Sequence, residues 1–224
     1  MTQAGNVTYN GPEDLPDTVP VFPLTGALLL PRGTMPLNIF EPRYLAMVEA
    51  AMRSNRLIGI VQPTEKERHG TAPELNPVGC LGRVAQYAET GDGRLLVNLV
   101  GIVRFRILAE VDSAALYRCC RIDTAGFAVD FVEGAGQDDV DRKGLIATFH
   151  AFVDAHDLQV DWGSIDRASN ETLVNSLSMM APYGSIEKQA LLEAASLRER
   201  AEILVAVTEL SLSGGSGSRR SPLQ

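Results

Sequence analysis

The sequence predicts an α+β protein in which a β-rich N-terminal lobe precedes a C-terminal helical bundle. In residues 18–128, apolar residues form short runs or alternate with polar ones, a pattern typical of strands. In residues 129–212, apolar residues recur every three or four positions, as in amphipathic helices. Because the strands come first and the helices second, the order is that of an α+β arrangement.

The first strand is expected at residues 19–24 and contains Pro20 and Pro23. Proline cannot donate to a strand ladder, so this strand suits the edge of a sheet. The residues that follow include four that force bends: Gly26, Pro31, Gly33 and Pro36. A helix should then begin at Pro42, because proline suits the first helical position. One face of that helix is apolar and must pack on something; it holds Tyr44, Leu45, Val48, Ala51 and Met52.

Further strands are expected at residues 57–61 and 116–124, with a charged loop without periodicity at 63–77. The Gly91-Asp92-Gly93 segment separates two long β-like runs and predicts a hairpin. In the second run, apolar residues alternate with Arg104 and Arg106. This alternation predicts an apolar inner face and a basic outer face.

The helical bundle is predicted from apolar stripes in residues 145–153, 173–180 and 190–194. A last helix should begin at Ser196, where Ser196 and Glu199 form a capping box. The chain ends, residues 1–17 and 213–224, are rich in Gly, Pro, Ser and charge. We expect both ends to be flexible tails, with the function located between them.

Composition excludes several classes of function. The net charge is −8 and the pI is about 4.9, which argues against nucleic acid as a partner because phosphate binding needs basic groups. No apolar stretch reaches the roughly 18 residues that a membrane-spanning helix needs. The three cysteines, Cys80, Cys119 and Cys120, show no metal-binding spacing and are expected to be reduced thiols in a cytoplasmic protein.

Motifs for catalysis are also missing from the sequence. It contains neither a GxxxxGK[ST] phosphate loop nor a GxSxG nucleophile motif. Ser185 and Lys188 are one helical turn apart, but Ser185 is better explained as a helix cap. His150 and His156 differ by six positions, whereas helical metal-binding pairs use three or four. We therefore predict no catalytic residue, no metal site and no cofactor.

Three ordered motifs over residues 19–212 resemble the N-terminal substrate-binding domain of the Lon ATP-dependent proteases. VPVFPLTGALLLPRGTMPLNIFEPRYLAMVEAAM is similar to the start of that domain, a proline-bounded strand, an apolar turn and a helix. GCLGRVAQYAETGDGRLLVNLVGIVRFRI resembles its hairpin with a D-G turn. SLSMMAPYGSIEKQALLEAASLRERAEILVAVTEL resembles its closing helices.

The resemblance implies a pseudo-barrel, PUA-like β lobe joined to a helical bundle. It also implies recognition of protein substrates. A full Lon protease continues into an ATPase module and a serine-lysine peptidase domain, whereas this chain ends in a Gly/Ser tail. We therefore expect a stand-alone, non-catalytic module that binds unfolded or specific protein segments. Its expected role is that of an adaptor in cytoplasmic quality control, with a protease or a chaperone as a further partner.

Two sets of residues are candidates for the binding site. An apolar turn holds Leu29, Leu30, Arg32 and Met35, which would bind extended peptide unless the helix that contains Tyr44 buries them. The alternative is a PUA-like module that binds RNA or a small ligand through Arg104 and Arg106. These two hypotheses differ in whether the apolar turn or the basic strand face is exposed.

Overall fold

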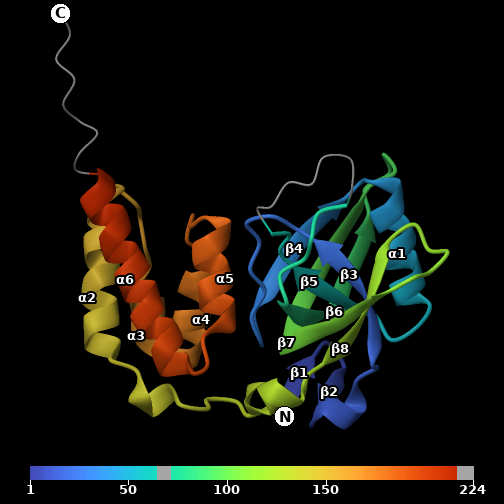
Figure 1. Cartoon of the computed structure of the whole chain (residues 1–224). Helices are drawn as coiled ribbons and strands as arrows, with labels where there is room; N and C mark the ends of the chain where they lie inside the picture. Colours follow the sequence, from blue (N-terminus) through green and yellow to red (C-terminus); the bar gives the residue numbers. More distant parts are fainter. Residues whose placement is uncertain (65–71, 216–224) are drawn as a thin grey trace, which may run out of the picture. The chain divides into compact units, whose positions relative to one another are not determined.

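The computed structural model describes residues 1–64 and 72–215 (Figure 1). Part of the predicted charged loop and most of the predicted C-terminal tail lie outside these residues. Residues 213–215 belong to the last helix instead of a tail. The chain forms two compact units, Met1–Glu133 and Gly134–Gln224, which are described separately. The α+β class predicted from the sequence is confirmed.

The first unit is built on a six-stranded sheet in the order β4-β7-β6-β5-β3-β8. β8 also pairs with β7, so β7, β6, β5, β3 and β8 close into a barrel and β4 extends it along β7. All neighbours are antiparallel except β3 and β5. The strands are β3 (Thr18–Pro23), β4 (Thr34–Ile39), β5 (Leu57–Val61), β6 (Val78–Glu89), β7 (Leu95–Val111) and β8 (Arg118–Asp123).

β3 lies inside the sheet, which corrects the expectation of an edge strand. Pro20 is in register with Cys119 of β8, and the pairing of β3 with β5 begins only at Val21. Pro23 is in register with Val61 of β5, beyond the end of the pairing with β8. Each proline therefore lies in a half of β3 that has a single neighbour, where a missing N–H is tolerated.

The barrel core forms around Phe105 of β7, which is fully buried. A Cβ atom on Gly59 would lie 2.8 Å from the Phe105 ring, and one on Gly79 would lie 2.6 Å from it. The two glycines therefore make room for the aromatic ring. Helix α1 (Pro42–Met52), which begins at the predicted proline, packs on β3 through Tyr44 and Phe22, whose ring centroids are 4.1 Å apart.

Arg104 is buried, contrary to the predicted basic outer face. Only 3% of it is exposed, and it forms an ion pair with Asp130 of η2 (Ala125–Phe131). Its Nε and Nη2 atoms donate to the two carboxylate oxygens, each at 2.9 Å, and its backbone N–H donates to Oδ2 at 2.9 Å. Phe127 of η2 also lies against the guanidinium. The alternation identified the face correctly, but η2 covers that face at Arg104 and leaves Arg106 exposed.

Residues 1–17 form local structure in place of the predicted flexible tail. A hairpin of β1 (Thr2–Ala4) and β2 (Val7–Tyr9) precedes a short 3-10 turn, η1 (Pro12–Asp14). Thr2, Ala4 and Tyr9 are buried. The hydroxyl of Thr2 donates to the carbonyl of Asp130, which also accepts from Arg32. Three-residue strands are too short to produce a recognisable period, so the sequence did not reveal this hairpin.

The second unit is helical, as predicted. Buried Arg200 of the last helix donates to the Leu191 carbonyl and to Asn175, each at 2.9 Å, and so connects three helices. The predicted N-cap at Ser196 accepts from the Glu199 N–H, while the Glu199 side chain accepts from the Ala195 N–H. The elements are η3 (Gln137–Asp139), α2 (Arg142–Ala155), α3 (Trp162–Arg167), α4 (Asn170–Met180), α5 (Ser185–Glu193) and α6 (Leu197–Gly215).

An Asp130→Asn substitution tests the buried ion pair. It should lower the free energy of unfolding by about 3–5 kcal/mol, because the buried guanidinium of Arg104 loses its counter-charge. Glu49→Gln is the matched control, since the Glu49–Arg53 pair is exposed and should contribute about 1 kcal/mol or less. Urea denaturation of both variants measures the difference, and equal losses would contradict the structural role of Asp130.

Candidate functional site

Leu29 and Leu30, predicted as a peptide-binding turn, are buried, with 1% and 0% of each exposed. A Cβ atom on Gly82 of β6 would lie 2.8 Å from the Leu29 side chain. A Cβ atom on Gly101 of β7 would lie 2.1 Å from the Leu30 carbonyl oxygen. The turn is therefore packed directly on β6 and β7, and a partner could reach these leucines only if the turn left the sheet.

The other two residues of the predicted turn also have structural contacts. Arg32 has a left-handed φ of 63°, and its backbone N–H donates to the Gly101 carbonyl at 2.8 Å. Its side chain donates to the Asp130 carbonyl at 2.7 Å and to Thr2 at 3.0 Å. Met35 is buried in β4. Peptide binding by the four residues stays a prediction, and the burial of Leu29, Leu30 and Met35 does not favour it.

Arg104 and Arg106, the alternative ligand-binding residues, do not form a shared basic surface. Arg104 is held by Asp130, whereas Arg106 is exposed and is in register with Val78 and Asp123. Only one of the two guanidinium groups is therefore presented to solvent. The acidic Asp123 beside it further weakens an electrostatic attraction for phosphate groups.

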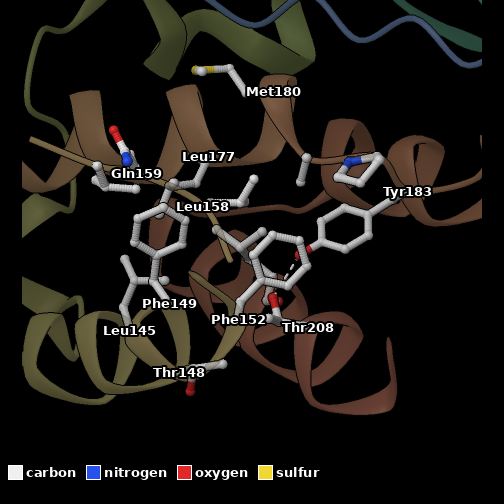
Figure 2. Close-up of a pocket in the computed structure, with 14 residues that line it drawn as sticks. Leu145, Thr148, Phe149, Phe152, Leu158, Gln159, Leu177, Met180, Tyr183 and Thr208 are labelled. Atoms are coloured by element: carbon white, nitrogen blue, oxygen red, sulfur yellow. Dashed lines mark hydrogen bonds between the residues drawn. The ribbon is translucent and has the colours of Figure 1, made fainter. Parts of the chain in front are cut away.

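A pocket that the sequence did not reveal lies in the helical unit (Figure 2). Its volume is about 250 Å³, and its walls are mainly apolar. They come from α2, the segment after α2, the end of α4, the α4–α5 connection and α6. The lining residues used below are Phe149, Phe152, Leu177, Met180, Tyr183 and Thr208.

Local sequence explains why the pocket is open. Leu145, Phe149 and Phe152 project from one face of α2, as their spacing predicts. Helix α4 ends at Met180, and the next residue is extended because Pro182 follows it. Residues 181–183 therefore leave the helix and form part of the pocket wall, and Met180 is left 81% exposed at the pocket. Apolar residues at or beyond helix ends, such as Met180 and Leu158, were the available signal in the sequence.

Two of the polar side chains in the pocket wall, Tyr183 and Thr208, have hydroxyl groups that contact each other. The oxygens of Tyr183 and Thr208 are 2.6 Å apart, as Figure 2 shows by a dashed line. Thr208 also donates to the carbonyl of Leu204, one turn earlier in α6, at 2.6 Å. Burial raises the pKa of Tyr183 above its ordinary value of 10.0, so the phenol is neutral at physiological pH.

The pocket is suited to binding apolar groups. Its lining contains no Asp, Glu, Lys, Arg or His side chain, so no group there can exchange protons near neutral pH. His150 stacks on Trp162 and His156 contacts the Phe152 carbonyl, and neither lines the pocket. Across residues 1–64 and 72–215, no three His, Cys, Asp or Glu side chains cluster as metal ligands would.

The three cysteines are free thiols in the first unit. Cys80 and Cys120 are buried, and Cys119 is half-buried. Burial raises the pKa of the Cys120 thiol to about 11. Because the thiolate is the reactive form, Cys120 should be inert at neutral pH.

A β barrel combined with a helical unit that carries an uncharged apolar pocket defines a binding module. The chain belongs to the ATP-dependent protease La (LON) substrate-binding domain family, whose model matches residues 18–208. This finding confirms the resemblance seen in the sequence. Within the described part of the chain, no helix combines the length and the apolar content needed to cross a membrane.

Curated relatives support the same assignment. The Lon protease of Desulfosudis oleivorans is 33% identical over 100 residues, which cover 43% of this chain and 12% of that protein. The Lon protease of Escherichia coli K12 is 25% identical over 203 residues, which cover 85% and 24%. The chain thus matches less than a quarter of the length of these relatives.

Two solved structures have a similar fold. A Lon N-terminal domain protein from Xanthomonas campestris has a TM-score of 0.61 at 20% identity, covering 84% of this chain and 97% of that one. The N-terminal domain of a Mycobacterium avium complex Lon protease has a TM-score of 0.59 at 18% identity, covering 86% and 98%. At this level of identity, the likeness establishes the fold.

A Gly101→Ala substitution tests the packing of the turn on β7. The new methyl group would collide with the Leu30 carbonyl, so the free energy of unfolding should fall by about 1–3 kcal/mol. Gly126→Ala is the control, because a Cβ atom there meets nothing within 4 Å. Thermal or urea unfolding that gave the same stability for both variants would show that the turn is loosely held.

Thiol labelling tests the burial of the cysteines. In the native protein at pH 8, a chromogenic disulfide reagent should modify one thiol per chain, the half-buried Cys119, and leave Cys80 and Cys120 unmodified. In denaturant, all three should react. If the native protein rapidly released three equivalents of chromophore per chain, all three thiols would be accessible, which is inconsistent with a closed barrel core.

Proposed function

We propose that this chain is a non-catalytic module that binds segments of other proteins and holds an apolar side chain in the pocket of the helical unit. The observation that carries the proposal is the pocket itself, which is apolar, open and free of charged side chains. Membership of a substrate-binding family supports it. Unfolded segments are suitable partners because they expose the apolar side chains that folded proteins bury.

The strength expected of such a contact fits transient capture. Full burial of one large apolar side chain contributes about 1.5–3 kcal/mol, equivalent to roughly a 10- to 150-fold gain in affinity. One pocket would therefore bind weakly, and several apolar side chains along a segment would be needed for a stable complex. This behaviour suits an adaptor in cytoplasmic protein quality control that delivers segments to a protease or a chaperone.

The ATP-driven proteolysis implied by the names of the relatives is not part of the proposed activity. RNA binding, the second hypothesis, has less support because Arg104 is buried and Arg106 stands beside Asp123. The overall negative charge also opposes binding to phosphate groups.

A Met180→Asp substitution tests the proposed site. A charge beside the pocket should weaken binding to a reduced, carboxymethylated and therefore unfolded model protein by about tenfold, because the apolar contact and its desolvation are lost. Fluorescence anisotropy of the labelled model protein measures the affinity. Ile186→Asp is the matched control, since Ile186 is 65% exposed in the same unit and does not line the pocket. If both variants bind as the wild type does, the pocket is not the site.

A further inference from the structure

We infer that the pocket selects an apolar group that carries a hydrogen-bond donor, and that the Tyr183–Thr208 hydroxyl pair makes this selection. The inference rests on the proposed function, because it names the chemistry of the side chain that the pocket holds. The argument depends on where the two hydroxyl protons are. Each hydroxyl group has one proton to donate and two lone pairs that accept.

The proton of Thr208 is committed within helix α6. Its oxygen lies 2.6 Å from the Leu204 carbonyl, which has no proton, so Thr208 must be the donor in that contact. A threonine hydroxyl that bonds to the carbonyl four residues earlier is a common arrangement in helices. The direction of this hydrogen bond is therefore determined by the helix backbone.

The Thr208 hydrogen bond also determines where the hydroxyl proton of Tyr183 lies. The Tyr183 and Thr208 oxygens are 2.6 Å apart, and Thr208 has already used its proton. Tyr183 must therefore donate to Thr208. The phenol oxygen keeps its lone pairs and presents only an acceptor to a bound group, and its raised pKa means that it remains a neutral phenol.

The remaining polar side chains do not oppose this selection. Gln159 is exposed, so its amide is already hydrated, and Figure 2 shows it projecting from the side of the pocket away from Tyr183. Thr148 lines the pocket as well, and its hydroxyl can both donate and accept. The hydroxyl pair of Tyr183 and Thr208 is thus the feature that distinguishes a donor from an acceptor.

Among protein side chains, tryptophan matches the pocket best. The pocket volume of about 250 Å³ exceeds the roughly 150 Å³ of an engineered apolar cavity that binds benzene, so a bicyclic aromatic ring is of suitable size. The indole group has one N–H donor and no acceptor. Phenylalanine and leucine have no side-chain donor for the lone pairs of the Tyr183 oxygen, and a tyrosine would bring an acceptor together with its donor.

The first test compares indole with benzothiophene, which has the same bicyclic shape with sulfur in place of the N–H. Titrations of the full chain, followed by the amide chemical shifts of pocket residues, give both affinities. Indole should bind about three- to tenfold more tightly, the gain expected from one neutral hydrogen bond. In Tyr183→Phe, this preference should disappear while benzothiophene binds within about twofold of its wild-type affinity.

A second variant tests the proton assignment without removing the phenol. In Thr208→Val, Tyr183 keeps its hydroxyl group but loses the acceptor for its proton, so it becomes free to donate. Quinoline has a ring nitrogen that accepts a hydrogen bond, whereas naphthalene has none. The ratio of quinoline affinity to naphthalene affinity should therefore be severalfold higher in the variant than in the wild type. An unchanged ratio of quinoline to naphthalene affinity would overturn the assignment.

The outcomes separate the two proposals. Equal wild-type affinities for indole and benzothiophene would overturn donor selection and leave the apolar pocket as the proposed site. Failure of both compounds to shift the pocket resonances at their solubility limits would overturn the pocket and, with it, the proposed mode of protein binding. Spectra of the unliganded variants provide the control for correct folding.

Discussion

The β-rich unit depends on the buried ion pair between Arg104 and Asp130. The Asp130 carboxylate accepts three hydrogen bonds from Arg104, and its carbonyl accepts from Thr2 and Arg32. Strand β7, the N-terminal hairpin, the turn before β4 and η2 therefore meet at one residue. An unpaired buried charge costs several kcal/mol. If any of these segments moved away from Asp130, polar groups in the remaining segments would lose their hydrogen-bond partners.

This constraint decides which surfaces are available for function. Arg104 and Arg32 are held in the cluster around Asp130, and the turn that contains Leu29 and Leu30 is held by hydrogen bonds to Gly101. These four residues, which the sequence suggested as candidates for binding, therefore stabilise the barrel. In the helical unit, by contrast, the break at Pro182 leaves apolar side chains with unfilled space beside them.

The sequence predicted local secondary structure well. It did not predict which residues are buried by segments that are distant in the chain. The hairpin around Gly91 and Gly93 and the start of α1 at Pro42 depend on adjacent residues, so their signals are strong. The burial of Arg104 depends on Asp130, 26 positions away, and alternation alone cannot show what covers a strand face. The same limit applies to the turn at Leu29 and Leu30, whose burial comes from glycines in β6 and β7.

The pocket illustrates a further limit of periodicity. The stripe containing Phe149 and Phe152 predicts an apolar helix face, and it is equally consistent with a filled core and with an open pocket. Whether space remains depends on how α4 ends and how the chain returns to α6. The chemistry of that space is more local, because the Thr208 proton is directed by its own helix and the Tyr183 proton follows from it. A threonine that donates to the helix carbonyl one turn earlier and faces a tyrosine can therefore give an apolar pocket a preference for donors without any charged residue.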